Sequence, residues 1–163
     1  MNPRERRTFS AGDGEEMVEF PFSKDEWSHV SEVARTVVNA TFADDAVLRA
    51  SGFAELCRVL SALSEEHGEH PVLLETEADF SDDPLRRLAL YEQAKELAAA
   101  IGWPTYSIRV SLARVLLDDI GDATRAAHEL AACSEEIAIY ADEREREEWE
   151  ELRGACASRA EVD

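Results

Sequence analysis

Basic residues are scarce in this chain of 163 residues, which carries 17 Lys and Arg against 36 Asp and Glu. The resulting net charge of −19 repels phosphate backbones and anionic lipid headgroups. The composition therefore argues against nucleic acid and against a membrane surface as binding partners. It favours a basic protein as the partner, with solubility in a high-salt cytoplasm as the alternative reason for the acidity.

Cysteine, glycine and proline are also few. Three cysteines with no C-x-x-C pair exclude a disulfide framework and favour a reducing, cytoplasmic location, with the thiols packed as small apolar groups. Seven glycines and five prolines, beside 45% hydrophobic and 33% charged residues, are typical of an ordered globular chain. No cofactor is predicted.

Long hydrophobic runs are absent. The longest stretch without a charge covers residues 97–108 and contains Gly102 and Pro104, so it is shorter than the roughly 20 apolar residues of a membrane helix. The first residues lack the apolar segment of a secretory signal. They also lack helical periodicity, and we expect a flexible tail over residues 1–21.

Alternating apolar runs bounded by turn residues, which half-buried strands require, are missing as well. Apolar residues instead recur at three- and four-residue steps from Ser23 onward. Short connections predict that consecutive helices pack antiparallel. The chain is therefore predicted to be all-α, with one helical domain over residues 22–163. About seven helices are expected, beginning near residues 24, 46, 71, 84, 106, 123 and 143.

Capping residues mark most of these helix starts. Ser23 with Glu26, and Asp142 with Glu145, form capping boxes. We expect the side chain of Thr105 to cap the fifth helix. Glycines are expected just beyond three helix ends, at residues 68, 102 and 121.

The fifth and sixth predicted helices share a pattern of small residues around a glycine turn. Gaps of five, four and three residues separate Gly121, Ala126, Leu130 and Cys133. This spacing resembles the tetratricopeptide repeat, and an echo of it lies 39 residues earlier in the chain. The resemblance covers about residues 70–140 and implies a solenoid of helical hairpins whose concave face binds a peptide, a helix or a partner domain. An irregular helical bundle is the alternative fold.

Acidic residues gather between Arg58 and Arg86, where neither Lys nor Arg occurs. In the helix predicted from Pro71, spacings of four and three residues place Glu75, Asp79 and Asp82 on one face. A row of like charges is mildly destabilising, and a basic partner relieves the repulsion. We predict a partner-binding surface here, with a merely solvated face as the alternative. A second, small contact patch is predicted at the aromatic residues that follow Gly102. The candidate contact residues are Glu75, Glu77, Asp79, Asp82, Asp83, Trp103 and Tyr106.

Signatures of catalysis and of metal binding are missing. The sequence contains no phosphate-binding loop, dinucleotide fingerprint, nucleophile elbow or H-E-x-x-H. His67 and His70 flank Gly68, which is predicted to end a helix and to scatter their geometry. Glu26-x-x-His29 matches half of a carboxylate-bridged metal motif, but the capping box already explains Glu26. We therefore predict no catalytic residue and no metal site.

These observations favour a non-catalytic protein–protein interaction module with an acidic surface that binds a basic protein. One form of such a module is a toxin-neutralising immunity protein that covers a basic active site. The first alternative is a regulatory or assembly adaptor that binds a peptide in a helical concave groove. The second alternative is a metal-binding helical bundle, with His67 and His70 as the residues to test.

Overall fold

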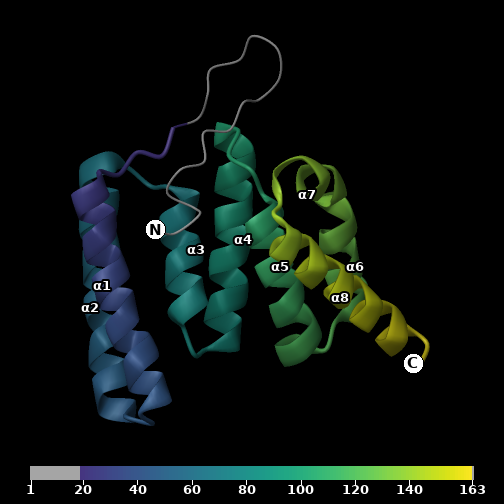
Figure 1. Ribbon diagram of the computed structural model, residues 1–163, viewed down its shortest axis with the longest axis horizontal. Coiled ribbons are helices and arrows are strands. Elements are labelled where there is room, and N and C mark those ends of the chain that lie inside the picture. Colours follow the sequence, from purple (N-terminus) through teal and green to yellow (C-terminus); the bar gives the residue numbers. More distant parts are fainter. Residues whose placement is uncertain (1–18, 163) are drawn as a thin grey trace. The chain divides into compact units, whose positions relative to one another are not determined.

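The computed structural model describes residues 19–162, and every regular element in this range is helical (Figure 1). Most of the flexible tail predicted for residues 1–21 lies outside the described residues. Because no strand occurs within residues 19–162, the all-α prediction is confirmed. The elements are α1 (Lys24–Phe42), α2 (Ala46–His67), α3 (Pro71–Phe80), α4 (Pro84–Ile101), α5 (Tyr106–Val115), a π-helical turn (Leu116–Ile120), α6 (Ala123–Ala132), α7 (Ser134–Tyr140) and α8 (Glu143–Ala160).

The sixth predicted helix is in fact two helices. No helix start was predicted between those near residues 123 and 143, but the chain leaves helical geometry at Cys133, where φ is −106° and ψ is 10°. In a continuous helix the carbonyl of Leu130 would accept from the amide of Ser134. That carbonyl instead accepts the indole N–H of Trp149 at 2.9 Å. The break between α6 and α7 thus coincides with a hydrogen bond from α8.

The contacts of the chain divide it into two compact units, the first ending at Ser81 and the second beginning at Asp82. The sequence predicted one domain over residues 22–163. The repeat-like segment, residues 70–140, extends across this boundary. Helices α5 and α6, which carry the repeat resemblance, pack against each other within the second unit. The solenoid arrangement itself stays a prediction.

The first unit is built on the hairpin of α1 and α2 (Figure 1). The turn between them places Asp44 in the left-handed region at φ 54°, and Asp45 caps α2 by accepting the amide of Leu48 at 2.9 Å. Gly52 of α2 is buried, and a Cβ added there would lie 3.2 Å from Cγ2 of Val37. Glycine at this position therefore lets the two helices approach closely.

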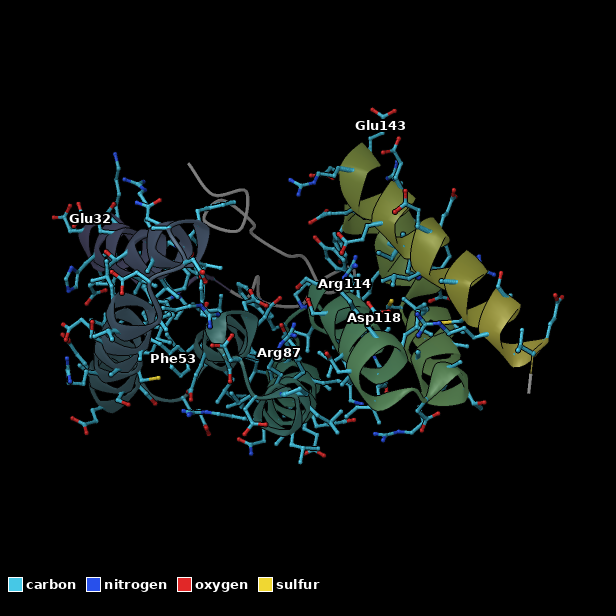
Figure 2. The ribbon with its side chains drawn as sticks, turned by 90° about the horizontal axis from the view of Figure 1, so that it is seen from below. Glu32, Phe53, Arg87, Arg114, Asp118 and Glu143 are labelled. Carbon is cyan, nitrogen blue, oxygen red and sulfur yellow. The ribbon has the colours of Figure 1, made fainter. Side chains whose placement is uncertain are left out.

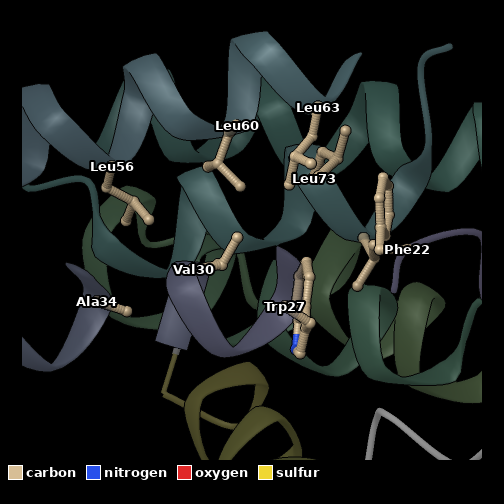
Figure 3. Packing of buried hydrophobic residues seen from close by; sticks show 9 residues of the cluster. Phe22, Trp27, Val30, Ala34, Leu56, Leu60, Leu63 and Leu73 are labelled. Carbon is tan, nitrogen blue, oxygen red and sulfur yellow. The ribbon is translucent and has the colours of Figure 1, made fainter. Parts of the chain in front are cut away.

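The core of the first unit joins side chains from α1, α2 and α3 with Phe22, which precedes α1 (Figure 3). The rings of Phe22 and Trp27 stack with their centroids 5.8 Å apart. This packing sets α3 beside the α1–α2 hairpin. The buried members of the core are Phe22, Trp27, Val30, Ala34, Leu56, Leu60, Leu63, Val72 and Leu73.

The second unit packs α4 and α6 against α5, and α8 against α6. Alanines at the helix contacts have no exposed surface, and their small side chains allow the backbones to come close. These alanines are Ala94, Ala98, Ala113 and Ala126. The thiols of Cys133 and Cys156 are buried, and burial raises the pKa of Cys133 to about 11. The predicted role of these two cysteines as small apolar groups fits this burial, whereas Cys57 is only partly buried.

Candidate partner-binding site

Three of the seven predicted contact residues, Glu75, Trp103 and Tyr106, are buried. Glu75 is only 2% exposed, so the prediction that it lies on an exposed acidic row is wrong. Helical spacing placed this carboxylate opposite Leu73 on α3. However, the first half of α3 is buried on several sides, so Glu75 is enclosed, whereas Asp79, one turn later on the same face, is exposed.

Trp103 and Tyr106 were predicted to be exposed, and the structure corrects this prediction too, since they are 7% and 2% exposed. The start of α5 packs against α7, where the rings of Tyr106 and Tyr140 stack with centroids 6.5 Å apart. A turn between two helices is therefore part of the packed interior here. Neither aromatic side chain is available as an exposed anchor for a partner.

The same packing corrects the predicted cap of α5. Thr105 makes no capping hydrogen bond with its side chain. Glu136 of α7 instead accepts the amide of Thr105 at 2.6 Å and that of Tyr106 at 2.9 Å, and the hydroxyl of Thr105 donates to its other oxygen at 3.0 Å. This helix start is stabilised by a side chain thirty residues further along the chain.

The other four predicted contact residues are fully or partly accessible. Asp82 and Asp83 are exposed and belong to the second unit, where Asp83 caps α4 by accepting the amide of Leu85 at 3.0 Å. Glu77 and Asp79 lie on α3 in the first unit, Glu77 partly buried and Asp79 exposed. Of the seven predicted contact residues, only Glu77 and Asp79 belong to an accessible surface of the first unit.

Asp79 borders a groove of about 430 Å³ between α1 and α3, and all of its lining residues belong to the first unit. Apolar side chains line most of it, and Arg35 on α1 and Asp79 on α3 supply its charged residues. The full lining is Trp27, Val30, Ser31, Ala34, Arg35, Val38, Thr76, Asp79 and Phe80.

Helical periodicity alone does not reveal this groove, because the apolar residues of α1 recur at three- and four-residue steps, as they do in a single core stripe. In the structure α1 carries two apolar faces. Val37 and Ala40 are only 1% exposed, and Val37 meets α2 near Gly52. Val38, one residue further round the helix, lines the groove and keeps 38% of its surface exposed. The adjacent valines 37 and 38 indicate two apolar faces in the sequence, since one narrow stripe on a helix cannot hold two consecutive residues.

A second cluster lies where the start of α1 meets the end of α2. Nε2 of His67 lies 2.8 Å from Oε1 of Glu26, whose other oxygen accepts the amide of Ser23 at 2.7 Å. The hydrogen bond with Glu26 raises the pKa of His67, and the same bond, aided by the Ser23 amide, lowers the pKa of Glu26. Glu26 is thus both the predicted capping residue and the partner of a distant histidine.

Glu66 completes a group of three side chains with donor atoms within 4.8 Å of one another. Two carboxylates and an imidazole are ligand types that Zn²⁺ accepts. Because His67 and Glu26 are already bonded to each other, a cation would have to displace the proton between them. The ion pair accounts for this arrangement without a metal.

His70 does not join this cluster as the metal-binding alternative would require. It is buried at the start of α3, where its Nδ1 accepts the amide of Val72 at 3.2 Å. Burial lowers the pKa of His70 to about 4, so the ring is neutral at pH 7. His70 therefore caps α3, a role that the sequence did not predict.

The second unit contains a network of charges around Glu129 of α6, which is only 7% exposed. Its carboxylate pairs with Lys95 of α4 at 2.9 Å and with Arg109 of α5 at 2.5 Å. Burial alone would lower the pKa of Lys95, but hydrogen bonds to Glu92 and Glu129 outweigh it, and the pKa is raised. These pairs connect α4, α5 and α6 and have a structural role.

No protein-family model matches the chain, and comparison with curated proteins and with solved structures finds no similar chain. Within residues 19–162, none of the helices combines the length and apolarity that crossing a membrane demands. Within the described residues, the α1–α3 groove combines accessible apolar surface with the charged side chains of Arg35 and Asp79.

Proposed function

We propose that the protein is a non-catalytic protein–protein interaction module whose first unit binds a basic segment of a partner protein. The observation that carries this proposal is the α1–α3 groove, which offers apolar area beside the exposed carboxylate of Asp79. Interfaces commonly combine an apolar centre with a polar rim in this way.

Charge supports a basic partner. Residues 19–81 contain thirteen acidic residues and only four Lys or Arg. Acidic side chains of both units point away from the helices, as Glu32 of α1 and Glu143 of α8 show (Figure 2). Such a field speeds the encounter with a basic protein and disfavours acidic competitors.

A toxin-neutralising immunity protein is one form of this proposal, in which the acidic chain covers a basic active site. It rests on size and charge alone. Its particular test is whether the bound partner is a toxin that the protein inhibits at a one-to-one ratio.

The proposal is tested by capturing partners from the native cell lysate with the full chain, and then by measuring the dissociation constant with the purified partner. The informative variant is Glu77→Lys/Asp79→Lys in the first unit. The matched control, Glu143→Lys/Glu147→Lys on α8, makes the same change in charge at two exposed positions of the second unit.

We expect binding to weaken by about tenfold or more between ~0.1 M and ~0.5 M salt, because screening shortens the reach of the charges. The α3 variant should weaken it by a similar factor and the α8 control by less than about twofold. Failure to capture any partner at either salt concentration would contradict the proposal. Equal losses in the two variants would contradict the assignment to the first unit.

A further inference from the structure

The apolar surface of α1 extends beyond the groove. Val38 lines the groove near its end, and Phe42 follows four residues later on the same side of the helix. Phe42 is 87% exposed and Val38 is 38% exposed. From Trp27 to Phe42 this side of α1 is about 22 Å long at 1.5 Å per residue.

The shape of this surface selects among possible ligands. A compact small molecule would fill the groove of about 430 Å³ and leave Phe42 in water. An elongated element along α1 would cover Val38 and Phe42 together and would touch the small exposed edges of Trp27 and Ala34, which are 3% and 9% exposed, at the floor of the groove. These four residues recur at intervals of seven, four and four, which is the spacing that a packed helix contacts.

We infer that the partner element is an amphipathic, basic α-helix of about four turns that lies along α1 between Trp27 and Phe42, with its apolar stripe in the α1–α3 groove. This inference rests on the proposed function and deepens it by naming the element that binds. On the α3 side, the exposed carboxylate of Asp79 contributes negative charge that attracts a Lys or Arg of the partner. On the α1 side, Arg35 favours a partner carboxylate, so the two edges set the direction of the bound helix.

The charge of the chain decides between this occupant and a second copy of the protein. Two copies would bring together chains that each carry −19, and their first units share the acidic excess. Like-charge contact opposes association, whereas a helix rich in Lys and Arg is attracted by the same field. A basic helix from a different protein therefore satisfies both the apolar stripe and the charge.

The test uses three synthetic peptides of roughly 16 residues with the full-length chain. The first has Leu at i, i+3, i+4 and i+7 positions and Lys elsewhere. The second has the same composition with the leucines scattered around the helix. The third keeps the leucine stripe but replaces Lys by Glu. Fluorescence anisotropy measures the dissociation constants at ~0.15 M salt.

Two variants report on the groove and its extension. Val38→Arg places a charge in the groove, and Ala54→Arg is its control, since it adds the same charge at an exposed position of α2. Phe42→Ser removes the exposed end of the stripe without touching the core. Ile139→Ser on α7 is the control for Phe42, because Ile139 is also highly exposed, at 70%.

We expect the striped basic peptide to bind at least about tenfold more tightly than the scattered and acidic peptides. Val38→Arg and Phe42→Ser should each weaken its binding by about fivefold or more, and both controls by less than about twofold. Equal binding of the striped and scattered peptides would overturn the inference, since charge alone would then explain it. Concentration-dependent dimerisation that Val38→Arg abolishes would also overturn it, by assigning the surface to a second copy.

The outcomes separate this inference from the proposed function. If the captured natural partner still binds Val38→Arg and Phe42→Ser unchanged, the protein is an interaction module but the helix site is wrong. If the striped peptide binds as expected while no partner is captured, the helix site stands and the proposed function fails.

Discussion

The imidazole of His67 and the carboxylate of Glu26 lie 2.8 Å apart, although the two residues are forty-one positions apart in the chain. The pair joins the first turn of α1 to the last turn of α2, beside the core residue Phe22, whose ring lies 5.4 Å from that of His67. It therefore closes the end of the hairpin next to α3 and the groove.

We predict that Glu26→Gln lowers the pKa of His67, because the hydrogen bond with Glu26 is the main cause of the elevated value. Two-dimensional NMR of the imidazole protons against pH measures the change. Glu66→Gln is the matched control and should lower the same pKa by less, since Glu66 acts only through its charge. Equal shifts in the two variants would show that the charge of nearby carboxylates, and not the hydrogen bond with Glu26, sets the pKa of His67.

The sign of this effect on stability follows from both partners. The pKa of His67 is raised in the folded protein. Its contribution to the free energy of unfolding is therefore complete below pH 6.5 and is lost as pH rises through the folded-state pKa. The pKa of Glu26 is lowered, so its contribution is complete above pH 4.5 and is lost as pH falls. Urea unfolding should therefore show a larger loss for Glu26→Gln near pH 5.5 than near pH 8.5.

The contribution of His70 to the free energy of unfolding changes with pH in the direction opposite to that of His67. Its pKa is about 4 in the folded protein against 6.5 when unfolded, so the unfolded chain binds the proton more readily. We expect the free energy of unfolding to fall by roughly 2 kcal/mol between pH 6.5 and pH 5 from this residue alone. Protonation of Nδ1 would also remove the acceptor for the Val72 amide at the start of α3.

Urea denaturation of His70→Asn at the two pH values checks this prediction. Asn can cap the helix without titrating in this range, so the variant should lose most of the pH dependence assigned to His70. His29→Asn, at an exposed position of α1, should leave the dependence unchanged. A wild-type slope in His70→Asn would refute the assignment.

Removal of the Glu136 carboxylate should destabilise the second unit. Glu136→Ala deletes the acceptor for the amides of Thr105 and Tyr106, and we expect a loss of about 2 kcal/mol. Glu135→Ala changes an exposed neighbour on α7 and should cost less than about 0.5 kcal/mol. Thermal or urea unfolding monitored by circular dichroism measures both, and similar losses would contradict the capping role.

The buried carboxylate of Glu129 is expected to be more costly to remove. Glu129→Gln leaves Lys95 and Arg109 without their shared counter-charge, and we expect a loss of about 3 kcal/mol in unfolding free energy. Glu92→Gln removes a more accessible partner of Lys95 and should cost about 1 kcal/mol. Chemical denaturation measures the two losses. The reverse order would show that burial of the carboxylate does not determine how much each ion pair stabilises the protein.

Two helical glycines should respond in opposite directions. A Cβ at Gly154 on α8 meets nothing within 4 Å, so Gly154→Ala should stabilise the protein by about 0.5–1 kcal/mol through helix propensity. A Cβ at Gly52 would lie 3.2 Å from Val37, so Gly52→Val should destabilise it by about 1–3 kcal/mol. Melting curves of the two variants test the close approach of α1 and α2.

Most helix starts could be predicted because the capping groups lie within a few residues of the amides they bond. The capping boxes of Ser23 with Glu26 and of Asp142 with Glu145 are both present. The left-handed glycines at the ends of α4 and the π-helical turn, Gly102 and Gly121, are also where the sequence placed them. Each of these features depends only on neighbours along the chain.

The predictions that were wrong all depend on residues distant in sequence. Thr105 was the natural local cap, but Glu136 reaches the same amides from α7. The helix predicted through Cys133 is broken beside a carbonyl that Trp149 occupies from α8. Local sequence patterns could not predict either partner, because the bonded residues are nineteen and thirty-one positions apart in the chain.

The sequence by itself determined the helical class, most helix starts and the acidic charge, since these follow from local hydrogen bonds, periodicity and composition. Tertiary structure decided which faces remain accessible, because periodicity orders residues around a helix without showing what packs against each side. Glu75 became buried in this way, and Val38 became part of an open groove. The candidate site exists only where α1 and α3, brought together by the core of the first unit, leave an apolar face uncovered.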